Sequence, residues 1–218
     1  MRVYFRVDVS TCMGVGHFKR CLTLAEILRQ RGVAVHFICR EHVGHRIETL
    51  SRLAIPCTVL TKPLQEASTV EDYTALLGAS QEEDAAETLS AFKGEKPDWL
   101  IVDHYGADQR WEKIVRPHVK KILVIDDLAN RSHDCDILLD QNFSDQGEGR
   151  YTKLVPSNCQ LLLGPRYALL GEEYAAYRRT LRQRDGQVKK VFVYCGDSDP
   201  HNMTGLALEV LSLPEIQH

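Results

Sequence analysis

The chain has 218 residues, a formal net charge of −3, 44% hydrophobic residues and 26% charged residues. These ordinary globular values argue against long disorder, and the slightly acidic balance argues against a nucleic-acid binder, which usually carries a basic stripe. No apolar run approaches the roughly 18 residues of a membrane helix, and charges interrupt the first ten positions, so we expect a cytoplasmic protein without a signal peptide. The number of cysteines, seven, is odd, and no two of them form a CxxC motif. This pattern argues against a disulfide framework and against a thiolate metal site.

Short apolar runs alternate with amphipathic stretches along most of the chain. A strand is expected over residues 3–9, then a glycine-bearing turn over 10–16, then a helix over 17–31 with apolar residues at spacings of three and four. The other expected strands are 33–39, 57–60, 99–102, 121–125, 137–139 and 161–163, and the other expected helices are 43–53, 81–92 and 109–115, the last capped by Asp108. Strands joined through helices predict an α/β fold with a parallel, Rossmann-like sheet.

The pattern changes after residue 165. A charged helix is expected over 171–184, a new strand over 188–195 and a helix over 203–213. One strand and one helix cannot bury their own apolar face, so we expect them to begin a second domain that the chain does not complete. The apolar residues that would need partners there are Val191, Val193, Leu206 and Leu208. The expected organisation is a sugar-binding and catalytic domain over 1–165, a connecting helix and linker over 166–187, and the first unit of a nucleotide-binding domain over 188–218.

The turn between the first strand and the first helix reads C-M-G-V-G-H-F-K-R. Gly14 and Gly16 permit a close approach of the backbone to a ligand, and free N–H groups at the helix start favour an anion such as a phosphate. A nicotinamide site is a minor alternative, because Lys19 occupies the third glycine position of that fingerprint. The positive helix end disfavours protonation of His17 and leaves it available as a base, although a histidine that only bonds a loop carbonyl fits equally well. Arg20, one turn later, shares its face.

Polar clusters follow two further strands, at residues 103–106 and 126–127. Since the carboxyl ends of parallel strands line the ligand crevice of an open sheet, we expect His17, Asp103 and Tyr105 around one crevice. The aspartates at 126 and 127 can bind magnesium or hydrogen-bond the surrounding loops, and the second reading is favoured because no third ligand is evident.

His42 and His45 are three residues apart, a spacing that suits a metal site. No acidic or cysteine partner is evident nearby, and a surface loop accounts for the pair as well. We therefore expect neither a metal ion nor a cofactor.

Four ordered segments carry a family signal. They read F-R-V-D-V-S-T-C-M-G-V-G-H-F-K-R-C-L-T-L-A at 5–25, L-I-V-D-H-Y-G at 100–106, I-L-V-I-D-D-L-A-N-R-S-H-D-C-D-I-L-L-D-Q-N at 122–142 and G-P-R-Y-A-L-L-G-E-E-Y at 164–174. Together they resemble the PseG/SpsG-type sugar-nucleotide hydrolases over most of residues 1–174.

The resemblance implies a two-domain glycosyltransferase-like (GT-B) architecture, of which this chain holds the N-terminal half. The sugar then lies in the cleft and the UDP mainly on the second domain. The implied substrate is a UDP-linked 2,4-diacetamido-2,4,6-trideoxyhexose, and the implied pathway is pseudaminic acid synthesis, with a link to flagellin glycosylation. The family's base matches His17, and the tyrosine of its D-H-Y-G turn matches Tyr105. The candidate substrate-binding residues are Gly14, Gly16, Arg20, Asp103 and Tyr105.

The family's second-domain turn, G-G-[ST]-D followed by an asparagine, is matched only in part by C-G-D-S-D at 195–199. An aspartate stands where a small residue is common. Gly196, Ser198 and Asn202 are the candidate nucleotide-binding residues. The sequence ends soon afterwards, which puts the activity of this chain alone in doubt.

The chemistry implied by the resemblance needs one base. Water attacks the anomeric carbon, and UDP is a good enough leaving group to depart without a protonating acid, unlike the alcohols released by glycosidases with paired carboxylates. Attack opposite UDP inverts the anomeric centre. The alternatives are a related glycosyltransferase with a sugar acceptor, and a non-catalytic binding module or inactive fragment. The expected partner is the small UDP-sugar, with no nucleic acid or membrane, and the oligomeric state stays open.

Overall fold

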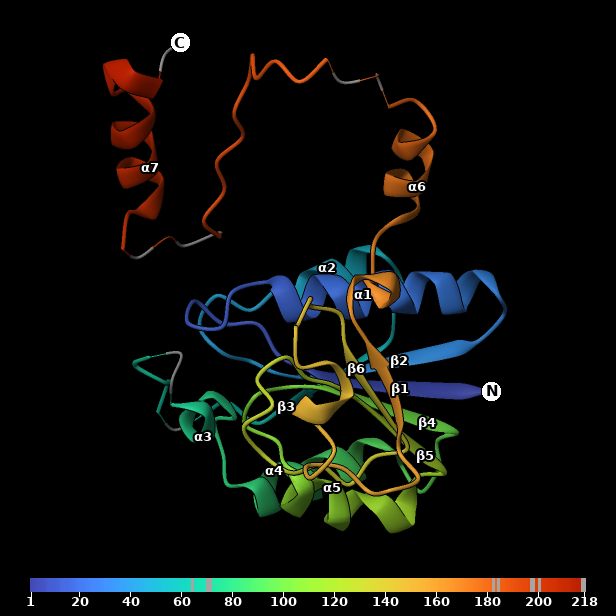
Figure 1. Cartoon of the computed structure of the whole chain (residues 1–218). Helices are drawn as coiled ribbons and strands as arrows, with labels where there is room; N and C mark the ends of the chain where they lie inside the picture. Colours follow the sequence, from blue (N-terminus) through green and yellow to red (C-terminus); the bar gives the residue numbers. More distant parts are fainter. Residues whose placement is uncertain are drawn as a thin grey trace. The chain divides into compact units, whose positions relative to one another are not determined.

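A seven-stranded parallel sheet forms the centre of the protein's first unit (Figure 1). The computed structural model describes residues 1–63, 65–69, 72–181, 183, 185–196, 199 and 201–216, and it divides into two units, Met1–Leu170 and Gly171–His218. The strands are β1 (Arg2–Val7), β2 (Ala34–Arg40), β3 (Cys57–Leu60), β4 (Trp99–Asp103), β5 (Lys121–Ile125), β6 (Ile137–Asp140) and β7 (Gln160–Leu163). Their order is β3-β2-β1-β4-β5-β6-β7, which for the first six strands is the doubly wound Rossmann order. The predicted α/β fold with a parallel sheet is confirmed.

Helices cover both faces of this sheet (Figure 1). Helices α1 (Gly16–Gln30) and α2 (Ile47–Arg52) lie on one face, and α4 (Gln81–Ala91) and α5 (Gln109–Val115) lie on the other. Side chains alternate between the faces along each strand, so Phe5 packs in the core beneath α1 whereas its neighbour Tyr4 packs in the core beneath α4. Both faces are therefore buried, as a parallel sheet requires.

The core beneath α4 also encloses a cluster of charged side chains. Asp84 of α4 accepts two hydrogen bonds from Arg6, at 3.0 Å to Nε and 2.6 Å to Nη2, and a third from Nη2 of Arg40 at 2.8 Å. Trp111 donates its Nε1–H to the same carboxylate at 2.9 Å. Asp8 pairs with Nη1 of Arg6 at 2.6 Å. We call Arg6, Asp8, Arg40 and Asp84 the buried ion cluster; each is at most 2% exposed.

Two histidines extend this cluster. Nε2 of His104 lies 3.3 Å from Oδ2 of Asp8, and Nε2 of His42 lies 3.5 Å from the same oxygen. His42 also contacts Glu66 through Nδ1 at 2.9 Å. The surface-loop interpretation is therefore wrong for His42, which is buried because it closes the end of the ion cluster.

Helix α4 begins with a capping box. The Ser80 hydroxyl accepts from the backbone N–H of Glu83 at 3.1 Å, and the Glu83 carboxylate accepts from the N–H of Ser80 at 3.0 Å.

We expect Ser80→Ala to lower the free energy of unfolding by about 1 kcal/mol, because it leaves an N–H at the helix start without its partner. Urea unfolding followed by tryptophan fluorescence measures this loss. The matched control is Ser90→Ala, an exposed position near the other end of the same helix, where alanine's helix propensity makes the change neutral or slightly stabilising. Equal losses for the two variants would contradict the capping argument.

Several element boundaries differ from the sequence predictions. The helix predicted over 43–53 is shorter and becomes α2, and the four-residue helix α3 (Tyr73–Leu76), capped by Asp72, was not predicted. Of the helix predicted over 171–184, the structure shows α6 (Glu172–Arg178), and residues 182 and 184 lie outside the described residues. Helices gain most of their stability from a packed apolar face, and no residue of α6 is buried.

The second unit contains α6, α7 (Met203–Leu211) and an extended segment. The strand predicted over 188–195 is wrong: these residues pair with no strand in the described part of the chain, and Phe192 is 88% exposed. Val191 and Val193 nevertheless line an apolar cavity with Leu206 of α7, as the predicted apolar face required, whereas Leu208 lies outside it. Among the described residues, no helix combines the length and hydropathy needed to cross a bilayer.

Candidate active site at the β1–β4 switch point

The first helix and the fourth strand meet where the order of the sheet reverses. The chain leaves β1, turns through residues 8–15 and enters α1, whereas β4 ends at Asp103. Strands β1 and β4 are direct neighbours, with Val7 level with Asp103. In open α/β sheets, ligands bind outside the carboxyl ends of the strands at such a switch point. The first turn of α1 therefore carries His17 to Asp103 at the place where a ligand is expected.

His17, Arg20 and Asp103 form one hydrogen-bonded group. Nδ1 of His17 lies 2.6 Å from Oδ1 of Asp103. Arg20 binds the same carboxylate with two nitrogens, Nε to Oδ2 at 2.6 Å and Nη2 to Oδ1 at 2.7 Å. Burial alone would raise the pKa of Asp103, but His17 and Arg20 outweigh it and hold the pKa well below its usual range. Asp103 is thus a carboxylate that only accepts.

This group fixes the orientation of the imidazole. Since Asp103 has no proton to give, Nδ1 of His17 must donate, and the lone pair of the neutral ring lies on Nε2. Nη2 of Arg20 also lies 3.0 Å from Nδ1, because both nitrogens donate to the same oxygen. Nε2 has no hydrogen-bond partner among the residues that the structure describes. An aspartate, an oriented histidine and a free Nε2 are the parts of a general base.

Tyr105 and Asp127 border the imidazole. The ring of Tyr105 meets that of His17 edge-on, with centroids 4.5 Å apart and planes at 88°. Its hydroxyl donates to Oδ1 of Asp127 at 2.8 Å, and Nη1 of Arg20 reaches Oδ2 at 3.1 Å. Burial, and after it the Asp127 charge, raises the pKa of Tyr105, so the hydroxyl stays protonated and keeps donating. As predicted, the aspartates after β5 hydrogen-bond their surroundings; Asp126 accepts from the N–H of Ala129 at 2.9 Å.

The two glycines leave room beside the histidine. Gly14 has φ of +70°, which suits glycine, and its N–H donates to the carbonyl of Ser10 at 2.9 Å. A Cβ atom at Gly14 or Gly16 would meet no atom within 4 Å. His104, one residue after Asp103, lies on the other face of the sheet, where its Nδ1 accepts from Gly106 at 2.9 Å. His104 is therefore separated from this group by the sheet itself.

The candidate nucleotide-binding residues belong to the second unit. Gly196 has φ of +90°. Asn202 has φ of +50° and caps α7, its Oδ1 accepting from the N–H of Gly205 at 3.2 Å. Ser198 lies outside the described residues. The structure does not relate this turn to His17, and its role in nucleotide binding stays a prediction.

Sequence reasoning missed two features of the site. It did not foresee that all three guanidinium nitrogens of Arg20 bind protein carboxylates, so that Arg20 orients Asp103 and Asp127; direct contact with substrate stays a prediction. It also gave Asp127 no connection to Tyr105, and no local spacing signals that contact. Among the described residues, no group of three or more histidine, cysteine, aspartate or glutamate side chains is arranged to hold a metal ion.

A comparison with curated proteins finds a relative of named activity. The chain is 31% identical over 205 residues to the UDP-2,4-diacetamido-2,4,6-trideoxy-beta-L-altropyranose hydrolase of Campylobacter jejuni, a match that covers 94% of this chain and 63% of that protein. It is also 25% identical over 217 residues to an uncharacterised protein of Methanocaldococcus jannaschii, covering 97% of this chain and 40% of that one. The chain thus spans less than two thirds of the length of either relative.

Comparisons with protein-family models and with solved structures give less information about function. No protein-family model matches the chain. Among solved structures, MurG of Acinetobacter baumannii aligns with a TM-score of 0.46 and 13% identity, over 73% of this chain and 44% of that one. Over its own length, the chain is similar to a PseG-type sugar-nucleotide hydrolase, and this similarity confirms the resemblance that its four sequence motifs indicated.

Proposed function

We propose that the protein hydrolyses a UDP-linked 2,4-diacetamido-2,4,6-trideoxyhexose to the free sugar and UDP, as a step of pseudaminic acid synthesis. The named activity of the Campylobacter jejuni relative supports the substrate. The single structural observation that supports the chemistry is the 2.6 Å contact between His17 and Asp103 at the switch point of the sheet, which leaves Nε2 of the histidine without a partner among the described residues. The proposal includes the GT-B architecture, with the nucleotide held mainly by a second domain that begins near residue 188.

His17 acts as the general base in this proposal. Its Nε2 takes a proton from water as the water oxygen bonds to the anomeric carbon from the face opposite UDP. The bond between that carbon and the phosphate oxygen breaks, and its electron pair leaves with UDP, so the anomeric centre is inverted. The Asp103 carboxylate stabilises the imidazolium that forms, because it accepts from Nδ1. One base suffices because the diphosphate leaves as a stable anion.

The neighbouring groups have supporting roles. Arg20 holds Asp103 in place with two hydrogen bonds and neutralises it, and Tyr105 packs against the imidazole edge-on. The open space over Gly14 and Gly16 admits the sugar, and the N–H groups that begin α1 favour the negative charge that develops on the leaving oxygen. We also propose a cytoplasmic location, since the seven cysteines are free thiols, as expected of a reducing compartment.

Release of UDP tests the proposed function. The protein is incubated with the UDP-linked diacetamido sugar, UDP is quantified, and proton NMR follows the first anomer formed. We expect UDP release without any sugar acceptor and an initial product of inverted configuration. Release that requires an acceptor would instead show a glycosyltransferase. Absence of release combined with thermal stabilisation by UDP would show a binding module, because a ligand that binds only the folded state raises its stability.

A further inference from the structure

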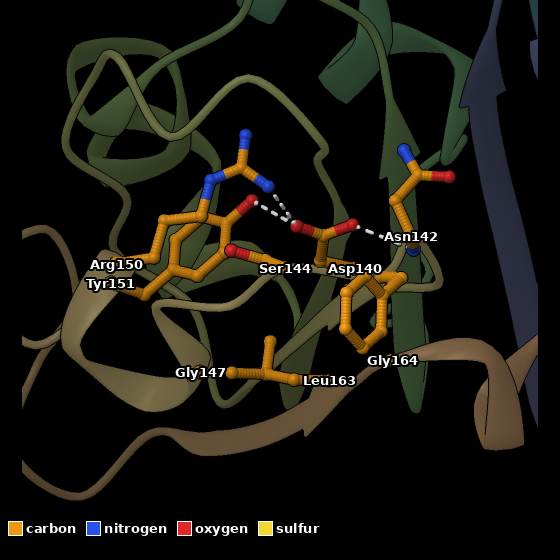
Figure 2. A pocket seen from close by; sticks show the side chains of 9 residues that line it. Asp140, Asn142, Ser144, Gly147, Arg150, Tyr151, Leu163 and Gly164 are labelled. Atoms are coloured by element: carbon orange, nitrogen blue, oxygen red, sulfur yellow. Dashed lines mark hydrogen bonds and ion pairs between the residues drawn. The ribbon is translucent and has the colours of Figure 1, made fainter.

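A cavity of about 230 Å³ lies at the carboxyl ends of β6 and β7 (Figure 2). Asp140, the last residue of β6, accepts hydrogen bonds from three of the residues that line this cavity. Figure 2 shows Arg150 and Tyr151 converging on one oxygen of this carboxylate, at 2.7 Å and 3.0 Å, while the other oxygen accepts from the N–H of Asn142 at 3.0 Å. The carboxylate is thus buried and satisfied, and it ties the loop over 141–150 to the end of the strand.

The charges of this cavity cancel. Asp140 and Arg150 are the charged side chains among its described lining residues, and they are paired with each other. Nη2 of Arg150 is committed as well, since it donates to the carbonyl of Asp127 at 2.6 Å. A phosphate prefers an unpaired cation or a cluster of free N–H groups. The cavity therefore suits an uncharged group.

The remaining walls are apolar with a few polar groups. Phe143 and Leu163 supply hydrocarbon surface, and Phe143 is 77% exposed, so most of its side chain is available to a ligand. Ser144 supplies a hydroxyl whose oxygen accepts from Gln146 at 3.2 Å, so its hydrogen is available to donate. The side-chain amide of Asn142 also lines the cavity, and hydrocarbon beside such donors matches a methyl group next to an amide carbonyl. Whole-ligand pockets usually measure roughly 300–1,000 Å³, so this smaller cavity fits one substituent of a ligand.

Asp127 joins this cavity to the catalytic group. Its carbonyl accepts from Arg150 of the cavity wall, and its carboxylate accepts from Tyr105 and Arg20 beside His17. The cavity and His17 also share the carboxyl edge of the sheet, at the ends of β6 and β4 respectively. Strand β5, which precedes Asp127, lies between β4 and β6, so a substituent of a sugar bound at His17 must extend past Asp127 to enter the cavity.

We propose that the cavity is a subsite for an acylamino substituent of the sugar, with the acyl methyl group against Phe143 and the amide carbonyl accepting from Ser144. This inference rests on the proposed function, because a sugar carrying such substituents must occupy the site. It adds a specificity determinant that distinguishes acetylated sugars from their free amines, since a free amine has neither the methyl group that packs against Phe143 nor the carbonyl that accepts from Ser144.

Phe143→Ala tests the subsite with three substrates: the UDP-linked diacetamido sugar and the two analogues in which one acetamido group is a free amine. We expect the variant to lose about tenfold in kcat/KM on the diacetamido substrate, mainly through KM, because the methyl contact is made before and during the reaction. One of the two analogues should be cleaved equally by variant and wild type, and this analogue identifies the substituent. The control is Val59→Ala on the edge strand β3, at the other end of the sheet, which should leave all three rates unchanged.

Failure of the subsite and failure of the proposed function give different results. If wild type cleaves the diacetamido substrate and Phe143→Ala cleaves each of the three substrates as fast as wild type does, the subsite is refuted and the hydrolase stands. If wild type cleaves none of them, the hydrolase is refuted, and saturation-transfer NMR with the free diacetamido sugar decides the subsite. Transfer to an acetyl methyl that disappears in Phe143→Ala supports it, and equal or absent transfer in both proteins overturns it.

Discussion

Replacing His17 with alanine is expected to lower the rate of UDP release by about 10²–10⁴-fold, the usual cost of removing a positioned general base. Its Nε2 has no hydrogen-bond partner among the described residues, so the change removes little that holds the fold together apart from one bond to Asp103, which keeps both bonds from Arg20. The affinity for UDP should be nearly unchanged, because a base acts in the transition state and contributes little to ground-state binding. Initial rates and calorimetric titration with UDP measure the two quantities.

A second variant separates catalysis from structure. His17→Asn keeps an N–H donor toward Asp103 but has no basic nitrogen, so it should fold like the wild type and be as inactive as His17→Ala. The matched control is His118→Ala, an exposed histidine before β5, which should keep full activity. If either His17 variant retains most of the activity, the base lies elsewhere; Asp103 is then the next residue to replace, because His104 lies on the other face of the sheet.

Replacing Asp84 with alanine is expected to lower the free energy of unfolding by about 3–5 kcal/mol, because it leaves buried charges without their partner. The carboxylate accepts from Arg6, Arg40 and the indole of Trp111, and none of these donors can reach water without disrupting the core. The matched control is Glu87→Ala in the same helix. Glu87 also binds Arg40, at 2.5 Å, but its side chain is 29% exposed, so its loss should cost about 1 kcal/mol or less. Equal losses for the two variants would contradict the role of burial.

The same carboxylate makes stability depend on pH. Burial alone would raise the pKa of Asp84, but the Arg6 charge outweighs it and lowers the pKa below that of an unfolded aspartate, about 4. The unfolded chain therefore takes up this proton first as the pH falls. The stabilisation is fully present above about pH 5 and is lost progressively below it. Urea unfolding between pH 7 and pH 3 should show a shallower acid loss in Asp84→Ala than in wild type; parallel curves would count against the assignment.

Periodicity was sufficient to predict the sheet. Residues 57–60 and 121–125 were predicted at their observed bounds, because a short apolar run flanked by polar turns is typical of a strand in a parallel sheet. The segment over 188–195 has the same local pattern and forms no strand. Strand formation depends on a neighbour that supplies the hydrogen bonds of the ladder, and local sequence does not report whether that neighbour is present.

The candidate site, like the fold, was predictable from the sequence only in part. Placement of His17, Asp103 and Tyr105 at one edge followed from their positions after strands, which topology alone brings together. The buried ion cluster could not be predicted. Arg6 and Asp84 are 78 positions apart, and nothing near either residue identifies the other as its partner. The sequence did contain one indication of buried charge. Arg6 and Asp8 alternate with apolar residues in the predicted strand, which places both side chains on one face of the sheet.

The central position of β1 has a consequence for synthesis on the ribosome. This strand is made first, yet one of its two neighbours is β4, and Asp84, one of the two carboxylates that bind Arg6, lies in α4. At roughly 5–20 residues per second, translation as far as residue 103 takes roughly 5–20 s. During this interval the nascent β1 has an unpaired edge, and Arg6 has Asp8 but not Asp84 as a partner; such edges associate with other chains. Slow translation before β4 has left the ribosome prolongs the exposure, whereas slow translation after that point does not.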